Sequence, residues 1–178
     1  VASQEALAYT WQIHPRDSDQ SDTHYRRTLQ MYRDLERDFP ERRQPVVLCL
    51  RRLADAAFHQ GNLPEAERMW REAIASGEAY LEQQPHNMDA RSNVCWSCKN
   101  LSEAILMRSA EGLAEAETLI TKGLELAAIV LDRQPRSSQA RDVTAFLRLN
   151  LAQCNCSTNR VDDAIGVFHR AVNEAESL

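Results

Sequence analysis

Apolar and small residues recur every three or four positions through most of the chain, as they do on one face of an α-helix. Ala66, Trp70, Ala73 and Gly77 are one such series, and polar residues fill the positions between them. The strict alternation of apolar and polar residues that is typical of strands is nearly absent. The pattern therefore predicts an all-α fold.

The helical pattern repeats along the chain. Ala66 and Pro85 lie nineteen residues apart, and so do Ala116 and Pro135. A third copy leads to Ala164, and the chain ends before a matching proline. Self-similarity at a period of 20 to 50 residues is typical of solenoid proteins, in which each repeat packs on the next.

Each copy has the signals of two helices joined by a tight turn. Gly61 occupies the turn because glycine adopts left-handed backbone angles without steric cost, and Asn159 stands at the same position in the third copy. Pro64 follows at the start of a helix, where its missing N–H is tolerated. Pro85 and Pro135 are expected to end the second helix of their copies.

A partial copy precedes these three, because Tyr25 stands fifteen residues before Pro40, as Trp70 stands before Pro85. We therefore expect residues 1–20 to be an N-terminal extension or partial helix, followed by a repeat domain over residues 21–178. The expected repeats cover residues 21–44 (partial), 45–85, 86–135 and 136–178.

The residues Leu53-Ala54, Gly61, Ala66, Trp70 and Ala73, with the closing proline, resemble the tetratricopeptide (TPR) pattern. The resemblance implies an α-α superhelix, a TPR-like solenoid of antiparallel helix hairpins, that binds a peptide or protein partner on its concave face. The repeats are longer than the family's usual length of about 34 residues.

The phrase from Tyr25 to Pro40 also resembles the long TPR-like repeats found C-terminal to bacterial serine/threonine protein kinases. That resemblance implies a segment of a signalling protein. The chain has no glycine-rich nucleotide loop, His-Arg-Asp or Asp-Phe-Gly, so we expect this segment not to be an enzyme even if its parent is a kinase. Because it starts at Val1 without a methionine, we also expect it to be cut from a longer protein.

In the TPR family, four positions of each first helix line the peptide-binding groove. Carried onto this sequence, these positions are Leu48, Arg51, Asp55 and Phe58, then Trp96, Lys99, Glu103 and Leu106, then Phe146, Leu149, Gln153 and Cys156. The resemblance implies a row of Leu48, Trp96 and Phe146, which with Arg51 and Lys99 beside it would take an apolar side chain with a neighbouring acidic group. The alternative is that some of these residues only pack against the next helix.

One specialised form of this groove clamps a C-terminal carboxylate with Lys, Asn and Arg side chains. Arg51 and Asn100 match two of the clamp positions, but Asp55, Phe146 and Asn150 stand at others. An aspartate facing a carboxylate ligand would repel it, so the sequence argues against this particular use.

Composition narrows the candidate chemistry. The formal net charge of -5 argues against a nucleic-acid partner. The sequence contains no run of about 18 apolar residues, so we expect no membrane insertion. The pair Cys95 and Cys98 could be redox-active or bind zinc, but a helical, largely apolar setting favours buried structural cysteine. We expect no cofactor or metal and a cytoplasmic location.

Two functions other than peptide binding remain open from the sequence. Exposed apolar ends of the stack could pair between chains, which would make the segment a homo-oligomerisation module. Polar groups converging in a closed pocket would instead indicate a small-ligand sensor or a regulatory domain of an enzyme.

Overall fold

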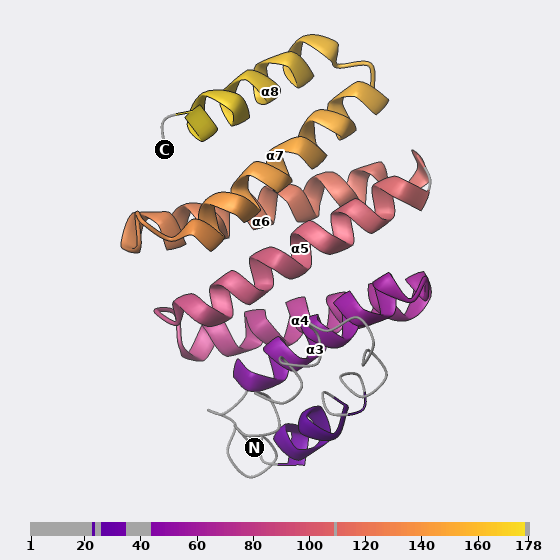
Figure 1. The fold of residues 1–178 in the computed structure, drawn as a ribbon, viewed down its shortest axis with the longest axis vertical. Helices are drawn as coiled ribbons and strands as arrows, with labels where there is room; N and C mark the ends of the chain where they lie inside the picture. Colours follow the sequence, from indigo (N-terminus) through magenta and orange to yellow (C-terminus); the bar gives the residue numbers. More distant parts are fainter. Residues whose placement is uncertain (1–22, 24–25, 35–43, 109, 177–178) are drawn as a thin grey trace. The chain divides into compact units, whose positions relative to one another are not determined.

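The computed structural model describes residues 23, 26–34, 44–108 and 110–176, and the regular structure in these ranges is helical, without strands (Figure 1). This confirms the predicted all-α class. Residues 26–34 are helical. The later elements are α3 (Gln44–His59), α4 (Leu63–Gln83), α5 (Met88–Arg108), the 3-10 helix η3 (Ala110–Gly112), α6 (Leu113–Arg133), α7 (Ser138–Ser157) and α8 (Val161–Glu176).

Part of the predicted organisation lies outside the described residues. Residues 1–20 belong to this part, and so do Tyr25 and Pro40, on which the partial first repeat was based. None of the described helices combines the length and apolar character needed to cross a membrane.

The chain divides into two compact units, and the boundary lies between Asn93 and Val94, inside α5. We call the part up to Asn93 the first unit and the part from Val94 the second unit, and each is described by itself.

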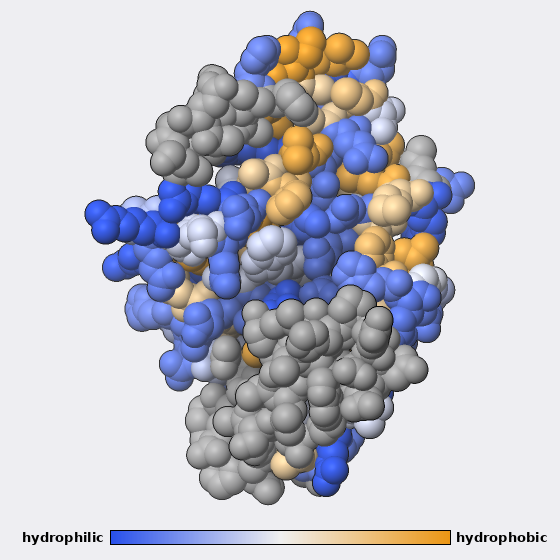
Figure 2. Space-filling view, viewed as in Figure 1, coloured by the Kyte–Doolittle hydropathy of each residue, from blue (hydrophilic) through white to orange (hydrophobic). Residues whose placement is uncertain are grey.

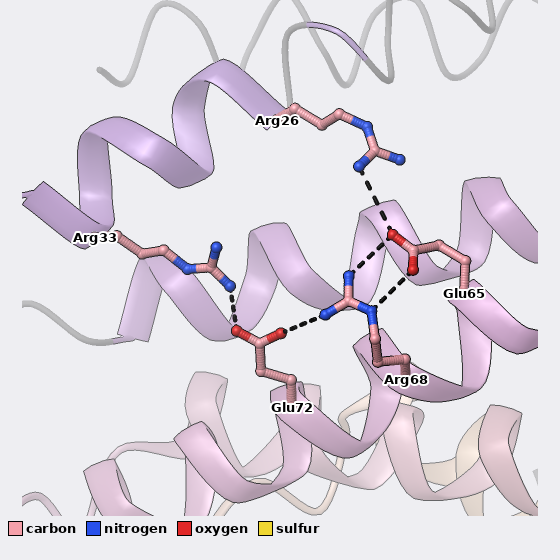
Figure 3. Close-up of polar contacts among 5 residues, drawn as sticks. All are labelled: Arg26, Arg33, Glu65, Arg68 and Glu72. Atoms are coloured by element: carbon pink, nitrogen blue, oxygen red, sulfur yellow. Dashed lines mark hydrogen bonds and ion pairs between the residues drawn. The ribbon is translucent and has the colours of Figure 1, made fainter.

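In the first unit, α3 and α4 pack against each other as a hairpin. Leu53 and Ala66 are fully buried, and Trp70 is 1% exposed. The helical residues 26–34 bury Leu29 and Tyr32 and are tied to α4 by ion pairs between arginines and glutamates. Figure 3 shows these ion pairs as a chain that runs through Arg26, Glu65, Arg68, Glu72 and Arg33.

In the second unit, α6 packs on α7 and α7 packs on α8. Gly123 of α6 marks a close approach, because a Cβ at this position would lie 2.8 Å from Leu147 Cδ1 of α7 and 3.4 Å from Cys98 Cβ of α5. Ile120 and Ala116, one and two turns earlier on α6, are fully buried. The face of small residues predicted from the repeat therefore is the packing face of α6.

The turns after α3 and α7 have the same structure. Gly61 (φ 78°) and Asn159 (φ 58°) both adopt left-handed backbone angles, as predicted. In each turn the residue that follows donates its N–H back to a carbonyl five residues earlier, which closes the helix end. These bonds join Asn62 N to Ala57 O at 2.8 Å and Arg160 N to Asn155 O at 2.7 Å.

The turn after α5 is built differently. It contains η3, and Gly112 has an ordinary φ of −87°. A Cβ on Gly112 would lie 2.3 Å from Ile105 Cγ2, so glycine here allows close packing and not a left-handed turn.

The ends of α4 and α6 fall two residues before Pro85 and Pro135, in agreement with the sequence. The following helices also begin alike. Asn87 Oδ1 accepts a hydrogen bond from Ala90 N at 2.9 Å, and Ser137 Oγ accepts one from Ala140 N at 3.3 Å. Short polar side chains at equivalent positions therefore satisfy the first backbone N–H groups of α5 and α7.

Candidate binding surface

The first unit uses its predicted groove residues in a buried polar network. Arg51 is 8% exposed and lies on α3. Its Nη1 donates to Asp55 Oδ2 at 3.0 Å, and its Nε donates to Asn93 Oδ1 at 3.0 Å. The other Asp55 oxygen, Oδ1, accepts from Trp70 Nε1 at 3.0 Å. These groups satisfy one another inside the unit.

The apolar groove candidates of the first unit are also partly covered. Leu48 and Phe58 are half-buried. The ring of Phe58 lies 5.6 Å from that of Trp70, centroid to centroid, and 5.9 Å from that of His59. Phe58 thus contributes to the packing of α3 on α4.

The second unit brings three of the predicted residues together. Trp96 of α5 and Phe146 of α7 have ring centroids 6.2 Å apart and an interplanar angle of 53°. Lys99 Nζ lies over the Phe146 ring, 4.7 Å from its centroid, which is cation–π geometry. Phe146 is 44% exposed and Leu149, one turn later on α7, is 43% exposed.

Lys99 also forms an ion pair with Glu103, one turn further along α5. The lysine side chain is only 12% exposed, whereas that of Glu103 is 42% exposed. The ammonium group thus contacts both the Phe146 ring and the Glu103 carboxylate, and the carboxylate is the more accessible charge.

The asparagines of the predicted site hold different places. Asn150 is buried, and its Nδ2 donates to Lys99 O at 3.2 Å and to Ser102 Oγ at 3.0 Å. It therefore ties α7 to α5 beneath the exposed residues. Asn100 is half-buried on α5, and Gln153 and Cys156 are exposed on α7. Leu106 is half-buried.

The structure adds one residue that the sequence analysis did not select. Asp142 is exposed on α7 and stands four residues before Phe146. Residues four apart on a helix lie on the same face, so its carboxylate belongs to the surface that carries Phe146 and Leu149. This spacing was readable from the sequence, but the TPR pattern does not include the position.

The cysteines are not grouped for metal binding in the described part of the chain. Cys95 and Cys98 are buried, as predicted. Cys49 and Cys154 are also buried, and Cys156 is exposed. Burial raises the pKa of the Cys154 thiol, and the negative charge of Glu117 adds to this effect while Arg160 opposes it.

Other surface features lie elsewhere on the second unit. A hollow of about 470 Å³ has its lining residues on one helix, at Ala114, Glu117, Thr118, Thr121, Lys122 and Glu125 of α6. Apolar atoms also reach the surface over α8 (Figure 2), where Val161 and Ile165 are 51% and 50% exposed.

Comparison with known proteins assigns no family to this arrangement. No model of a protein family matches the chain, and no curated protein matches it.

Proposed function

We propose that the chain is a protein-interaction and scaffold module, a TPR-like solenoid whose second unit binds a peptide or a segment of a partner protein. The observation that carries the proposal is the exposure of Phe146 and Leu149 beside the half-buried Trp96. Large apolar side chains that remain accessible next to aromatic packing are typical anchors of binding surfaces.

The repeated local structure supports the solenoid part of the proposal. Turns of the same geometry recur at Gly61 and Asn159, and helix starts of the same kind recur at Asn87 and Ser137. Stacked repeats place equivalent residues in a continuous row. In this proposal the surface that carries Trp96 and Phe146 is part of the concave face.

The setting proposed for the module is a signalling protein such as a kinase, in a reducing, cytoplasmic compartment. The resemblance of the Tyr25 to Pro40 phrase to kinase-associated repeats supports the first part. The burial of four cysteines as free thiols supports the second.

Selection of random peptides displayed on phage against the whole chain tests the proposal. Enriched peptides are synthesised, and their affinities for the wild type and for F146A are compared by fluorescence anisotropy. Removing a central aromatic anchor is expected to weaken binding by about 2 kcal/mol. The matched control is I129A on α6, because Ile129 is 42% exposed and thus similar to Phe146.

The proposal fails if no peptide is enriched, or if the enriched peptides bind F146A as tightly as they bind the wild type. Circular dichroism of both variants shows whether the helices remain intact, since Phe146 also contacts Trp96 and Lys99.

Homo-oligomerisation is a second candidate because Val161 and Ile165 expose apolar surface one turn apart on α8. Sedimentation at several protein concentrations distinguishes the two functions. A mass that rises with concentration and is restored to that of one chain by V161S/I165S favours self-association.

A small-ligand sensor has weaker support, since the described lining of the α6 hollow comes from a single helix and does not enclose a ligand.

A further inference from the structure

We infer that the segment bound by the second unit carries a basic residue next to an apolar one. The inference rests on the proposed function and reverses the charge expected from the sequence, which was an acidic group facing Arg51 and Lys99. The inference depends on which charged side chains of the candidate surface are accessible to a ligand.

The cations at the groove positions are already engaged within the protein. Arg51 is buried in the first unit and donates to both Asp55 and Asn93. Lys99 is 12% exposed, pairs with Glu103 and contacts the Phe146 ring with its ammonium group. An acidic ligand would have to displace these contacts before it could reach either cation.

The accessible charges beside the apolar anchors are carboxylates. The Glu103 side chain is 42% exposed and pairs with Lys99, whose ammonium group lies over the Phe146 ring. Asp142 is exposed one turn before Phe146 on α7. A ligand side chain seated on Phe146 would therefore have a carboxylate near it on α5 and another on α7.

The nearest cation along α7 does not share this face. Arg148 lies two residues after Phe146, and at about 100° per residue the two side chains point to opposite sides of the helix. Arg148 instead interacts with Arg170 of α8, whose charge adds to the effect of burial in lowering the pKa of the Arg148 guanidinium. Arg148 is therefore not placed to neutralise Asp142 on the face that carries Phe146.

The apolar part of the ligand follows from the two anchors. Phe146 and Leu149 are three residues apart, so their side chains adjoin on the same helix face. Together they offer a surface for one aliphatic or aromatic side chain. A basic residue adjacent to that side chain in the ligand would reach Glu103 or Asp142.

The peptides enriched on the whole chain provide the test. We expect them to carry Lys or Arg within a residue or two of an aliphatic or aromatic residue. For a synthesised peptide, E103Q and D142N are each expected to weaken binding roughly fivefold, since an accessible ion pair contributes about 1 kcal/mol or less. Added salt should weaken binding to the wild type more than to the E103Q/D142N double variant.

The matched control is E125Q, which removes one exposed carboxylate from α6 and is expected to leave the affinity unchanged. Acidic enriched peptides that bind E103Q more tightly would overturn the charge inference and leave the binding function intact, provided that F146A still weakens binding. Peptides whose affinity is insensitive to F146A would overturn the proposed function itself.

Discussion

The two units place a cation and a carboxylate four residues apart at equivalent positions of a helix, and the two pairs have different surroundings. In the first unit, Arg51 and Asp55 are joined at 3.0 Å and their side chains are 10% and 12% exposed. In the second unit, Lys99 is similarly covered but Glu103 is 42% exposed. The same sequence pattern thus gives a buried ion pair in the first unit and an ion pair with an accessible carboxylate, Glu103, in the second.

The residues around each pair explain the difference. Trp70 supplies an N–H to Asp55, and Asn93 supplies a carbonyl oxygen to Arg51. The repeat places Ile120 and Val143 at the positions equivalent to these two. Neither side chain can donate or accept a hydrogen bond. The Lys99–Glu103 pair therefore lacks the two hydrogen bonds that Trp70 and Asn93 make with the Arg51–Asp55 pair.

Removing one carboxylate from each pair is the strongest test of this comparison. We expect D55A to lower the free energy of unfolding by about 3 kcal/mol, because it leaves the buried Arg51 charge and the Trp70 N–H with one partner fewer. E103A should cost less than about 1 kcal/mol, as is usual for an exposed pair on one helix. Urea unfolding followed by circular dichroism measures both.

Two further variants identify the cause of the D55A effect. D55N keeps the shape and an oxygen for Trp70 and is expected to cost less than D55A. R51M/D55L replaces the pair by apolar side chains and should recover much of the lost stability, since neither charge of the pair then remains buried. Equal losses for D55A and E103A would show that burial of the first pair contributes nothing to stability.

The turns provide a second comparison with a smaller expected effect. We expect G61A and N159A each to cost about 1 kcal/mol, because alanine is strained at left-handed backbone angles. Gly61 has no atom within 4 Å of a built Cβ, so its cost comes from the backbone alone. Thermal unfolding of both variants measures the effect.

G112A distinguishes the middle turn from the other two. Its backbone suits alanine, and the cost should come from contact with Ile105 Cγ2. Moving the branch of that side chain in G112A/I105L should therefore relieve most of the loss, whereas no second-site change of this kind is available for G61A. Failure of I105L to improve G112A would mean that the middle turn is strained in its backbone instead.

The sequence predicted the parts of the fold that depend on local chemistry. Left-handed angles at Gly61 and Asn159 follow from what these residues tolerate, and the helix ends before Pro85 and Pro135 follow from proline's effect on the preceding residue. The burial of Ala66 and its equivalents follows from helical periodicity. Each of these signals is contained within a few residues of the chain.

The accessible charges were not predictable in the same way. Helical spacing gives the angle at which Arg51, Lys99 and Glu103 leave their helix, but not which neighbour covers them. Coverage depends on contacts such as Lys99 with Phe146, some fifty residues away, and Asn93 with Arg51. The repeat register indicated that Trp96, Lys99 and Phe146 adjoin, as they do. Only the three-dimensional contacts showed that the Glu103 carboxylate is more exposed than the Lys99 ammonium group.

The smallest expected effect concerns the exposed ion pairs of the first unit, which join residues 26–34 to α4 (Figure 3). A hydrogen bond from Arg68, aided by the charges of Arg68 and Arg26, lowers the pKa of the Glu65 carboxyl from its ordinary value of 4.5, and partial burial opposes this shift. Since the folded state lowers this pKa, the resulting stabilisation is complete above about pH 4.5 and is lost as the pH falls through the lower folded value.

We therefore expect E65Q to be less stable than the wild type by a few tenths of a kcal/mol at neutral pH, and to lose less stability than the wild type on acidification. Urea unfolding at about pH 7 and about pH 3.5 measures the difference. E82Q, which removes an exposed carboxylate near the end of α4, is the matched control for the loss of one charge. If E65Q and the wild type lose the same stability between the two pH values, the ion pairs of Glu65 with Arg26 and Arg68 do not contribute to the stability of the first unit.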